Sequence, residues 1–288
     1  MTTDVERLVP EELRLDARGV TNYLVIRLRR HLEQYSQRRS AVIGLSGGVD
    51  SSVVACLAVR AVGAARVHLY YLPSDSTSTQ DERDAHAVVE LLKVPGENFQ
   101  VVAIDSLAGE FTKKAGVGSR DRLVVGNIKA RVRMILLHAY AQRARALVVG
   151  TGDKSELTIG YFTKFGDGGV DVLPLGDLFK TQVRQIAAYL GLPETVYTKP
   201  PSPGLWKDQS AEGELGIDYF LLDRILYRRF DLWKDEAEIA RDLKISREQV
   251  DRIVGLVKKT QHKRYPPEIF RVSFRSHGSD WRYPREWR

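Results

Sequence analysis

The sequence predicts an α/β protein: a doubly wound parallel sheet with flanking helices and a small helical cap toward the C-terminal end. Two observations lead to this prediction. Short apolar runs alternate with amphipathic helical segments through the first 150 residues, and strands alternating with helices form parallel sheets covered on both faces. From about residue 205 onward the pattern is helical only. We therefore expect a single domain over residues 1–288, with residues 205–288 forming the cap and a basic tail.

The first half of the chain supplies the predicted sheet. Residues 41–45 form a short apolar run that ends in glycines, which is typical of a buried strand. Residues 120–145 predict a long helix, in which Val125, Ile128, Val132 and Ile135 follow one stripe with Ala139. In order, the predicted elements are helix 13–35, strand 41–45, helix 52–62, strand 66–72, helix 80–92, strand 99–104, helix 120–145 and strand 146–150.

The alternation stops at residues 161–176, which contain four glycines. A long loop of this kind usually has a function. Residues 199–204 carry three prolines, so we expect them to be extended or turning. The remaining predicted helices are residues 181–190, 219–229, 235–243 and 246–262.

Composition excludes several classes of protein. Hydrophobic residues make up 43% and charged residues 28%, as in a globular protein. No apolar run approaches the ~18 residues of a membrane span, and the first twenty residues are too charged for a signal peptide. We expect no membrane partner. Cys56 is the only cysteine, so no intrachain disulfide can form, and we expect a cytoplasmic protein.

The net charge of +7 is concentrated at one end of the chain. Residues 252–288 hold ten Lys/Arg and three acidic residues, whereas the first 251 residues hold 34 of each kind. A basic end of this kind is consistent with a nucleic-acid partner, with a phosphate-bearing small molecule or with a solvated face.

Residues 46–52 (Ser-Gly-Gly-Val-Asp-Ser-Ser) lie between a predicted buried strand and a predicted helix. Gly47 and Gly48 let backbone N–H groups approach an anion closely, and the helix start adds free N–H donors. Asp50 would repel a phosphate directly, but its carboxylate suits Mg²⁺. The segment matches neither G-x-x-x-x-G-K-[ST] nor G-x-G-x-x-G. It is read as a phosphate-binding turn, the alternative being a glycine turn with Asp50 as a helix cap.

This heptad resembles the S-G-G-x-D-S loop of the ATP pyrophosphatase superfamily, whose members cleave ATP between the α and β phosphates and adenylate an acceptor. Later segments resemble the NAD synthetase family in order and spacing, from about residue 41 to residue 267. They are residues 127–133 (NIKARVR), 150–156 (GTGDKSE) and 161–171 (YFTKFGDGGVD), then Pro174-Leu175, Lys180 and His262-Lys263.

The resemblance implies a ligase that adenylates the nicotinate carboxylate of deamido-NAD with ATP, releases pyrophosphate, and then amidates the carboxylate with ammonia to give NAD and AMP. It also implies Mg²⁺, ATP as co-substrate and a homodimer built around the helix at residues 120–145. Ammonia is expected as the direct nitrogen donor, because a glutaminase needs an activated cysteine and Cys56 lies in an apolar run.

The resemblance also implies roles for individual residues. The implied ATP contacts are Gly44, Leu45, Ser46, Gly47, Gly48, Val49, Asp50, Ser51, Thr151, Lys180 and Ser202. The implied deamido-NAD contacts are Arg131, Lys164, Asp171, His262 and Lys263, joined by Asn127, and the implied magnesium ligands are Asp50 and Glu156. One departure stands out: the family reads Q-[ST]-D-E-x-x-L-G where residues 209–216 read Q-S-A-E-G-E-L-G, so that Ala211 replaces an aspartate.

Two other functions are compatible with parts of the sequence. Residues 235–257 resemble a helix-turn-helix beside a basic tail, as in a DNA-binding module. However, Glu248 and Asp251 would face phosphates on the early turns of its second helix, so a packed cap is favoured and no nucleic-acid partner is expected. A tRNA-modifying member of the superfamily is the nearer alternative. Thiolating members need reactive cysteines, and the sequence has no paired cysteines and no zinc-ligand spacing.

Overall fold

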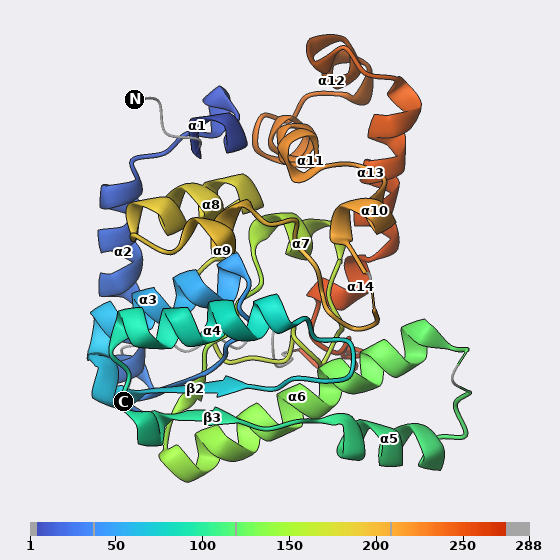
Figure 1. The fold of residues 1–288 in the computed structure, drawn as a ribbon. Helices are drawn as coiled ribbons and strands as arrows, with labels where there is room; N and C mark the ends of the chain where they lie inside the picture. Colours follow the sequence, from blue (N-terminus) through green and yellow to red (C-terminus); the bar gives the residue numbers. More distant parts are fainter. Residues whose placement is uncertain (1–4, 37, 119, 208, 275–288) are drawn as a thin grey trace.

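The computed structural model describes residues 5–36, 38–118, 120–207 and 209–274. Four parallel strands form one sheet in the order β3-β2-β1-β4, and helices cover both faces (Figure 1). The predicted α/β architecture is therefore confirmed. The strands are β1 (Ala41–Gly44), β2 (Val67–Tyr71), β3 (Phe99–Val101) and β4 (Leu147–Val148).

The strand order reverses at β1. The chain passes from β1 to β2 and β3 on one side, and then returns to place β4 on the other side of β1. Ala41 of β1 lies opposite both Val67 and Leu147. The segments that follow β1 and β4 therefore diverge at the carboxyl edge of the sheet, where sheets of this type bind ligands.

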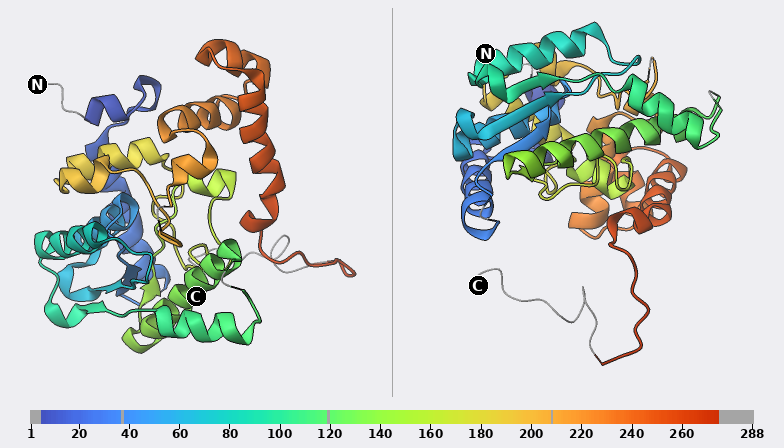
Figure 2. Two further views of the ribbon diagram at one scale, coloured as in Figure 1. Left: turned by 45° about the vertical axis from the view of Figure 1, so that its right-hand side comes forward. Right: turned by 90° about the horizontal axis from the view of Figure 1, so that it is seen from below.

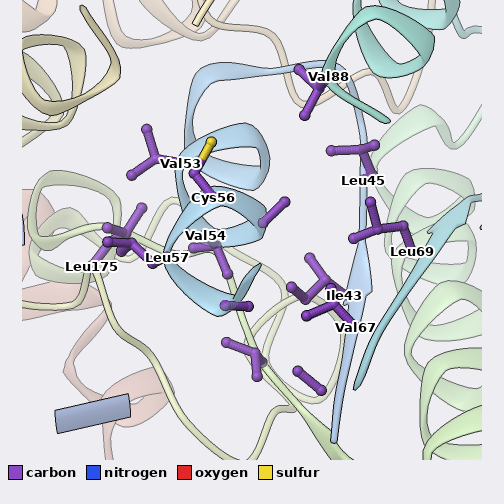
Figure 3. Close-up of a cluster of buried hydrophobic side chains, with 14 of the residues drawn as sticks. Ile43, Leu45, Val53, Val54, Cys56, Leu57, Val67, Leu69, Val88 and Leu175 are labelled. Atoms are coloured by element: carbon purple, nitrogen blue, oxygen red, sulfur yellow. The ribbon is translucent and has the colours of Figure 1, made fainter. Parts of the chain in front are cut away.

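One face of the sheet is covered by α2 (Ala17–Arg30), α3 (Val49–Val62), α4 (Thr79–Leu92) and α8 (Lys180–Tyr189). Helix α3 is buried on nearly all sides, because it lies between the sheet and the outer helices. Figure 3 shows the side chains of α3 in one cluster with those of the strands, and Leu57 lies beside Leu175 on the side of the helix away from the strands. Packing in the core thus fixes the position and the rotation of α3.

The opposite face is covered by α5 (Asp105–Lys114) and α6 (Arg122–Ala144). The predicted stripe of α6 is only partly in the core: Val132 is buried, whereas Ile135 is 50% exposed and Ala139 is exposed. Apolar surface on α6 is thus left on the outside of the molecule.

The predicted helical cap consists of α10 (Ala211–Leu215), α11 (Tyr219–Leu226), α12 (Glu236–Leu243) and α13 (Arg247–Lys259), which share their own hydrophobic cluster. Val9 and Leu13, from the other end of the chain, are buried in the same cluster. Beyond α13, α14 (Gln261–Arg264) precedes residues 265–274, which lead away from the body (Figure 2). Residues 275–288 of the predicted basic tail lie outside the described residues.

Several boundaries differ from the sequence prediction. The helix expected over residues 13–35 is divided into η1 (Glu11–Leu13), α2 and the π-helical η2 (His31–Tyr35). The strands predicted over residues 99–104 and 146–150 are shorter, and Val149 pairs with Val172 in an isolated bridge. The other elements are α1 (Val5–Leu8), η3 (Ala64–Arg66), η4 (Gly96–Asn98), α7 (Lys154–Ile159), α9 (Glu194–Thr198) and η5 (Tyr227–Asp231). Among the described residues, no helix combines the length and the apolar character that crossing a membrane requires.

Candidate active site

The predicted phosphate turn joins β1 to α3, and Gly47 makes its shape possible. Gly47 has a φ of +77°, and a Cβ at this position would lie 2.1 Å from the carbonyl oxygen of Asp81. No other residue fits without moving the first turn of α4. Gly48 is the N-cap of α3, so the helix start, with its free N–H groups, lies just beyond the carboxyl end of β1.

Serine hydroxyls hold this turn together. Ser51 Oγ accepts a hydrogen bond from Ser46 N–H at 3.1 Å and donates to Gly48 O at 3.1 Å. Ser52 Oγ donates to Gly48 O at 2.8 Å. The side chain of Leu45 is instead buried in the core, so only its backbone can reach a ligand. Gly44 lies at the end of β1, and Val49 is the first residue of α3.

Three carboxylates meet one lysine beside the turn. Asp50, Asp153 and Glu156 have oxygen atoms within 4.8 Å of one another. Lys180 Nζ lies 2.6 Å from Asp50 Oδ2, 2.8 Å from Asp153 Oδ2 and 2.8 Å from Glu156 Oε1. Lys180 and Asp153 are fully buried. We call these four residues the acidic cluster.

The fold explains why the members of the acidic cluster meet. Asp50 follows β1, whereas Asp153 and Glu156 follow the neighbouring parallel strand β4. Asp153 is the N-cap of α7 and accepts a hydrogen bond from Glu156 N–H at 2.8 Å. Lys180 is the first residue of α8. Asp153 is not among the site residues predicted from the sequence. It follows a strand and stands three residues before Glu156, which is a helix-start signal.

Burial dominates the electrostatics of the acidic cluster. Loss of solvation raises the pKa of Asp153 to about 6 against the attraction of Lys180, and it raises the pKa of Glu156 well above its usual range. For Lys180, burial favours the neutral amine, but the surrounding carboxylates outweigh it and raise the pKa. With every group ionised, three negative charges surround one positive charge, so the cluster favours additional positive charge.

Five of the residues implied to contact deamido-NAD form a second group. Arg131 Nη2 donates to Lys164 O at 3.3 Å, and Lys164 Nζ donates to His262 O at 2.7 Å. Lys263 Nζ donates to the carbonyl oxygens of Gly160 and Phe162, both at 2.7 Å. Asn127 Oδ1 accepts a hydrogen bond from Thr163 Oγ1 at 2.7 Å. The structure thus brings α6, residues 160–164 and α14 together. We call Asn127, Arg131, Lys164, His262 and Lys263 the basic cluster.

Three further predicted residues lie outside these two clusters. The carboxylate of Asp171 accepts a hydrogen bond from Val148 N–H at 2.8 Å, which ties it to β4. Thr151 follows β4 and is half-buried. Ser202 Oγ donates to Gln209 O at 2.7 Å within the segment that leads to α10. For Asp171 and Ser202, the hydrogen bonds shown here fix the local backbone.

Ala211, where the family carries an aspartate, is fully buried in the cap cluster. Its N–H donates to Pro201 O at 3.0 Å. Three residues along the chain, Glu214 accepts a hydrogen bond from Tyr161 OH at 2.6 Å and another from Gln209 Nε2 at 3.0 Å. The carboxylate of Glu214 therefore connects this segment to the start of the glycine-rich loop.

Lys129 is a buried basic residue that is not among the predicted site residues. Its Nζ lies 2.6 Å from Asp75 Oδ1 and 3.2 Å from Leu205 O. It lines a cavity of about 330 Å³ together with Trp206 and Arg122. Lys129 thus joins the loop after β2 to the segment that carries Ser202.

The chain is similar to known proteins over most of its length. The NAD synthase family model matches residues 20–267. NH(3)-dependent NAD(+) synthetase of Sulfurisphaera tokodaii is 50% identical over 280 residues, covering 97% of this chain and 98% of the relative. Among solved structures, NMN synthetase from Francisella tularensis has a TM-score of 0.77 at 33% identity, over 89% of this chain and 99% of that chain. NH3-dependent NAD synthetase from Campylobacter jejuni has a TM-score of 0.75 at 26% identity, over 90% and 100%. The chain therefore belongs to the NAD synthase family.

Proposed function

We propose that this enzyme adenylates the nicotinate carboxylate of deamido-NAD with ATP and then joins ammonia to it, which gives NAD, AMP and pyrophosphate. The observation that carries the proposal is the acidic cluster beside the phosphate turn, at the point where the strand order reverses. An anion-binding helix start next to carboxylates and a lysine is suited to a metal-bound polyphosphate. The relatives named as NH(3)-dependent NAD(+) synthetases support the choice of substrates.

ATP is proposed to bind with its phosphates at the turn formed by residues 46–51, and Thr151 and Ser202 contribute further contacts. Lys180 offsets the charge that develops on the leaving pyrophosphate. Gly44, Leu45 and Val49 contribute through the backbone, since the Leu45 side chain is in the core.

The acidic cluster fits a magnesium ion. Its donors are carboxylate oxygens, the ligand type that Mg²⁺ prefers. Asp50 Oδ1 is buried and has no hydrogen-bond partner among the described residues, so a lone pair is available in the site. We assign Asp50 and Glu156 as the ligands, with Asp153 beside them. When bound, the ion would neutralise phosphate charge and help to orient the pyrophosphate.

Deamido-NAD is proposed to lie across the basic cluster, with Asp171 as a further contact. The dinucleotide carries its own pyrophosphate, which the cations of Arg131, Lys164 and Lys263 can attract. The hydrogen bonds shown here from these three side chains go to main-chain carbonyls, so no carboxylate neutralises them through those bonds.

The chemistry then follows from placement. A nicotinate carboxylate oxygen attacks the α-phosphorus of ATP, and the bond to the pyrophosphate oxygen breaks. Free ammonia attacks the acyl carbon of the resulting acyl-adenylate, AMP leaves, and the ammonia nitrogen loses a proton. The protein acts mainly by holding the reactants together and by stabilising negative charge.

We further propose a homodimer that covers the exposed apolar surface of α6, where Leu123 is 65% and Ile135 50% exposed. The division into one synthetase domain with a cap stays a prediction. A cytoplasmic location is proposed from the single cysteine, which allows no intrachain disulfide.

The test is a product analysis with ATP, Mg²⁺, ammonium chloride and deamido-NAD. We expect NAD, AMP and pyrophosphate in equal amounts, and no glutamine-dependent turnover. Stoichiometric ADP and phosphate would contradict the adenylation mechanism. Nicotinate mononucleotide should be tested in parallel, because one structural relative is an NMN synthetase. A clear preference for the mononucleotide would retain the reaction class but overturn the substrate assignment.

A further inference from the structure

A carboxylate behind the acidic cluster belongs to neither cluster. Asp223 lies on α11 of the cap and is fully buried. Its Oδ1 accepts a hydrogen bond from Ser155 Oγ at 2.5 Å. Its Oδ2 accepts one from Thr181 N–H at 2.9 Å and one from Thr181 Oγ1 at 2.8 Å. One side chain of the cap therefore joins the first turn of α7 to the first turn of α8.

These two turns carry most of the acidic cluster. Ser155 lies between Asp153 and Glu156, and Thr181 directly follows Lys180. Ser155 Oγ also accepts a hydrogen bond from Lys180 N–H at 2.9 Å. Because Ser155 Oγ accepts there, its own hydrogen is available for Asp223, and the bonds form a continuous path from the backbone of Lys180 to the cap.

The ionised form of Asp223 is the one that this geometry holds. Burial raises the pKa of Asp223 to about 7, against the hydrogen bonds from Ser155 and Thr181. Three donors point at two oxygens, which matches the acceptor capacity of a carboxylate. A carboxylate that is buried without a cation in direct contact is costly, which argues for a specific role in return.

A second residue of α11 faces the same cluster. Tyr219, one helical turn before Asp223, is fully buried, and its ring centroid lies 5.3 Å from Lys180 Nζ. Its hydroxyl has no hydrogen-bond partner among the described residues. Helix α11 therefore contacts the acidic cluster in two ways. Tyr219 lies against Lys180, and Asp223 bonds to Ser155 and Thr181, which are next to cluster residues in the chain.

We propose that Asp223 is a positioning residue, which sets the distance between the Asp153–Glu156 turn and Lys180 and so prepares the acidic cluster for the metal–nucleotide complex. The inference rests on the proposed function of that cluster. It gives the cap a role at the proposed ATP site, because Asp223 of α11 joins the first turns of α7 and α8, which carry Glu156 and Lys180.

The main test compares Asp223→Asn with Asp218→Ala. Asp218 is the N-cap of the same helix and accepts a hydrogen bond from Leu221 N–H at 2.7 Å, so its loss weakens α11 without touching the cluster. We expect Asp223→Asn to raise the Mg²⁺ concentration for half-maximal activity about 10- to 100-fold. The KM for deamido-NAD should stay within about threefold, and Asp218→Ala should lower only the thermal midpoint.

Two further measurements distinguish a positioning role of Asp223 from a purely structural one. Thr181→Val removes one of the three hydrogen bonds with little change in volume, and it should shift the Mg²⁺ requirement in the same direction by a smaller factor. Calorimetry measures the binding of α,β-methylene-ATP at several Mg²⁺ concentrations without turnover. Asp223→Asn should lose the part of the binding affinity that depends on Mg²⁺.

The outcomes separate the two proposals. If Asp223→Asn and Thr181→Val lower the thermal midpoint but keep the wild-type Mg²⁺ dependence in both assays, Asp223 is only structural and the inference is wrong. If wild-type enzyme makes AMP and NAD but binds the analogue without any Mg²⁺ dependence, the metal assignment fails. If wild-type enzyme makes no AMP, the proposed function itself fails.

Discussion

The acidic and basic clusters surround their charged groups with opposite kinds of partner. In the acidic cluster, carboxylates outnumber the single ammonium group of Lys180, and its three ion pairs are all with side chains. In the basic cluster, Lys164 and Lys263 donate to main-chain carbonyls, which carry only partial charge. One region therefore favours a cation and the other favours an anion.

With the proposed function, this difference lets one enzyme bind two polyphosphate substrates. On that proposal, carboxylates match a nucleotide that arrives with a metal ion, and cations match a dinucleotide that arrives without one. Carbonyl partners hold the lysines in place without neutralising them. Each region is thus organised before substrate binds, which reduces the cost of ordering side chains on binding.

The largest effect is expected at the acidic cluster. Asp50→Asn and Glu156→Gln should each fold, because Lys180 keeps two carboxylate partners, but each should lose activity. A charge-assisted contact contributes roughly 1.5–3 kcal/mol, or about 10- to 150-fold, and a metal ligand should reach the upper end or exceed it. Steady-state assays over a Mg²⁺ series measure this loss. Asp177→Asn is the matched control, because Asp177 is an exposed acid that pairs with Lys154 and lies outside the acidic cluster. Wild-type Mg²⁺ dependence in Glu156→Gln would remove Glu156 from the site.

A smaller, substrate-specific effect is expected at the basic cluster. Replacing His262 and Lys263 with alanine should raise the KM for deamido-NAD about 10-fold or more, in line with one or two charge-assisted contacts. The KM for ATP should change much less. The control replaces the exposed pair Lys258 and Lys259, at the end of α13, with alanine. Equal increases in both KM values would show that the two clusters are not separate in function.

Cys56 provides a test outside both clusters. Burial raises the pKa of its thiol to about 12, and Figure 3 shows the sulfur on α3 among apolar side chains. The native enzyme should therefore resist iodoacetamide at pH 8, and alkylation should follow only unfolding. Cys56→Ala should lower the free energy of unfolding by about 1 kcal/mol and keep ammonia-dependent turnover. Turnover that depended on Cys56 would point to a glutaminase-type nucleophile instead.

The smallest effect is expected for an ion pair at the surface. Its contribution to stability can be compared with the effects of removing charges from the buried acidic cluster. Glu12 Oε1 lies 2.7 Å from Arg224 Nε and 2.9 Å from Arg228 Nη1. Although burial acts in the opposite direction, these arginines lower the pKa of Glu12 from 4.5 to about 2. The stabilisation is thus complete above pH 4.5 and is lost as the pH falls toward 2. Glu12→Gln should cost about 0.2–1 kcal/mol at neutral pH.

Urea unfolding at neutral pH and again at about pH 3 measures this difference between wild type and Glu12→Gln, which should shrink at the lower pH. Glu11→Gln is the matched control on the same exposed turn. An unchanged difference at both pH values would show that Glu12 acts through packing and not through charge.

Much of the turn after β1 could be predicted from the sequence, because its signals are contiguous. Residues 46–52 carry the glycines, the hydroxyls and Asp50 within one turn, and the strand before them is plainly apolar. Asp153 could also have been assigned, since it precedes a helix and stands three residues before Glu156. Helix α5 was missed because Gly109 lies in its middle and lowers its helix propensity.

The contribution of the cap could not be predicted in this way. Asp223 bonds to Thr181, which is 42 positions away in the sequence, and Tyr219 lies against Lys180; only the packing of α11 against α7 and α8 brings these residues together. The stripe of α6 was read as one face, yet Ile135 is exposed and Val132 is buried. Periodicity indicates which residues share a face, but it does not indicate what covers each part of that face.

The N-terminal segment has a consequence for how the chain is assembled during synthesis. Val9 and Leu13 belong to the hydrophobic cluster of the cap, and Gln182 of α8 holds the Leu13 carbonyl at 3.0 Å. These residues leave the ribosome long before the helices at residues 211–257 exist to cover them. Contacts of such long sequence separation form late and slow the search for the native state. The last stage of folding should therefore bring the two ends of the described chain together, and ribosome-bound fragments that lack the cap should expose this apolar segment to chaperones.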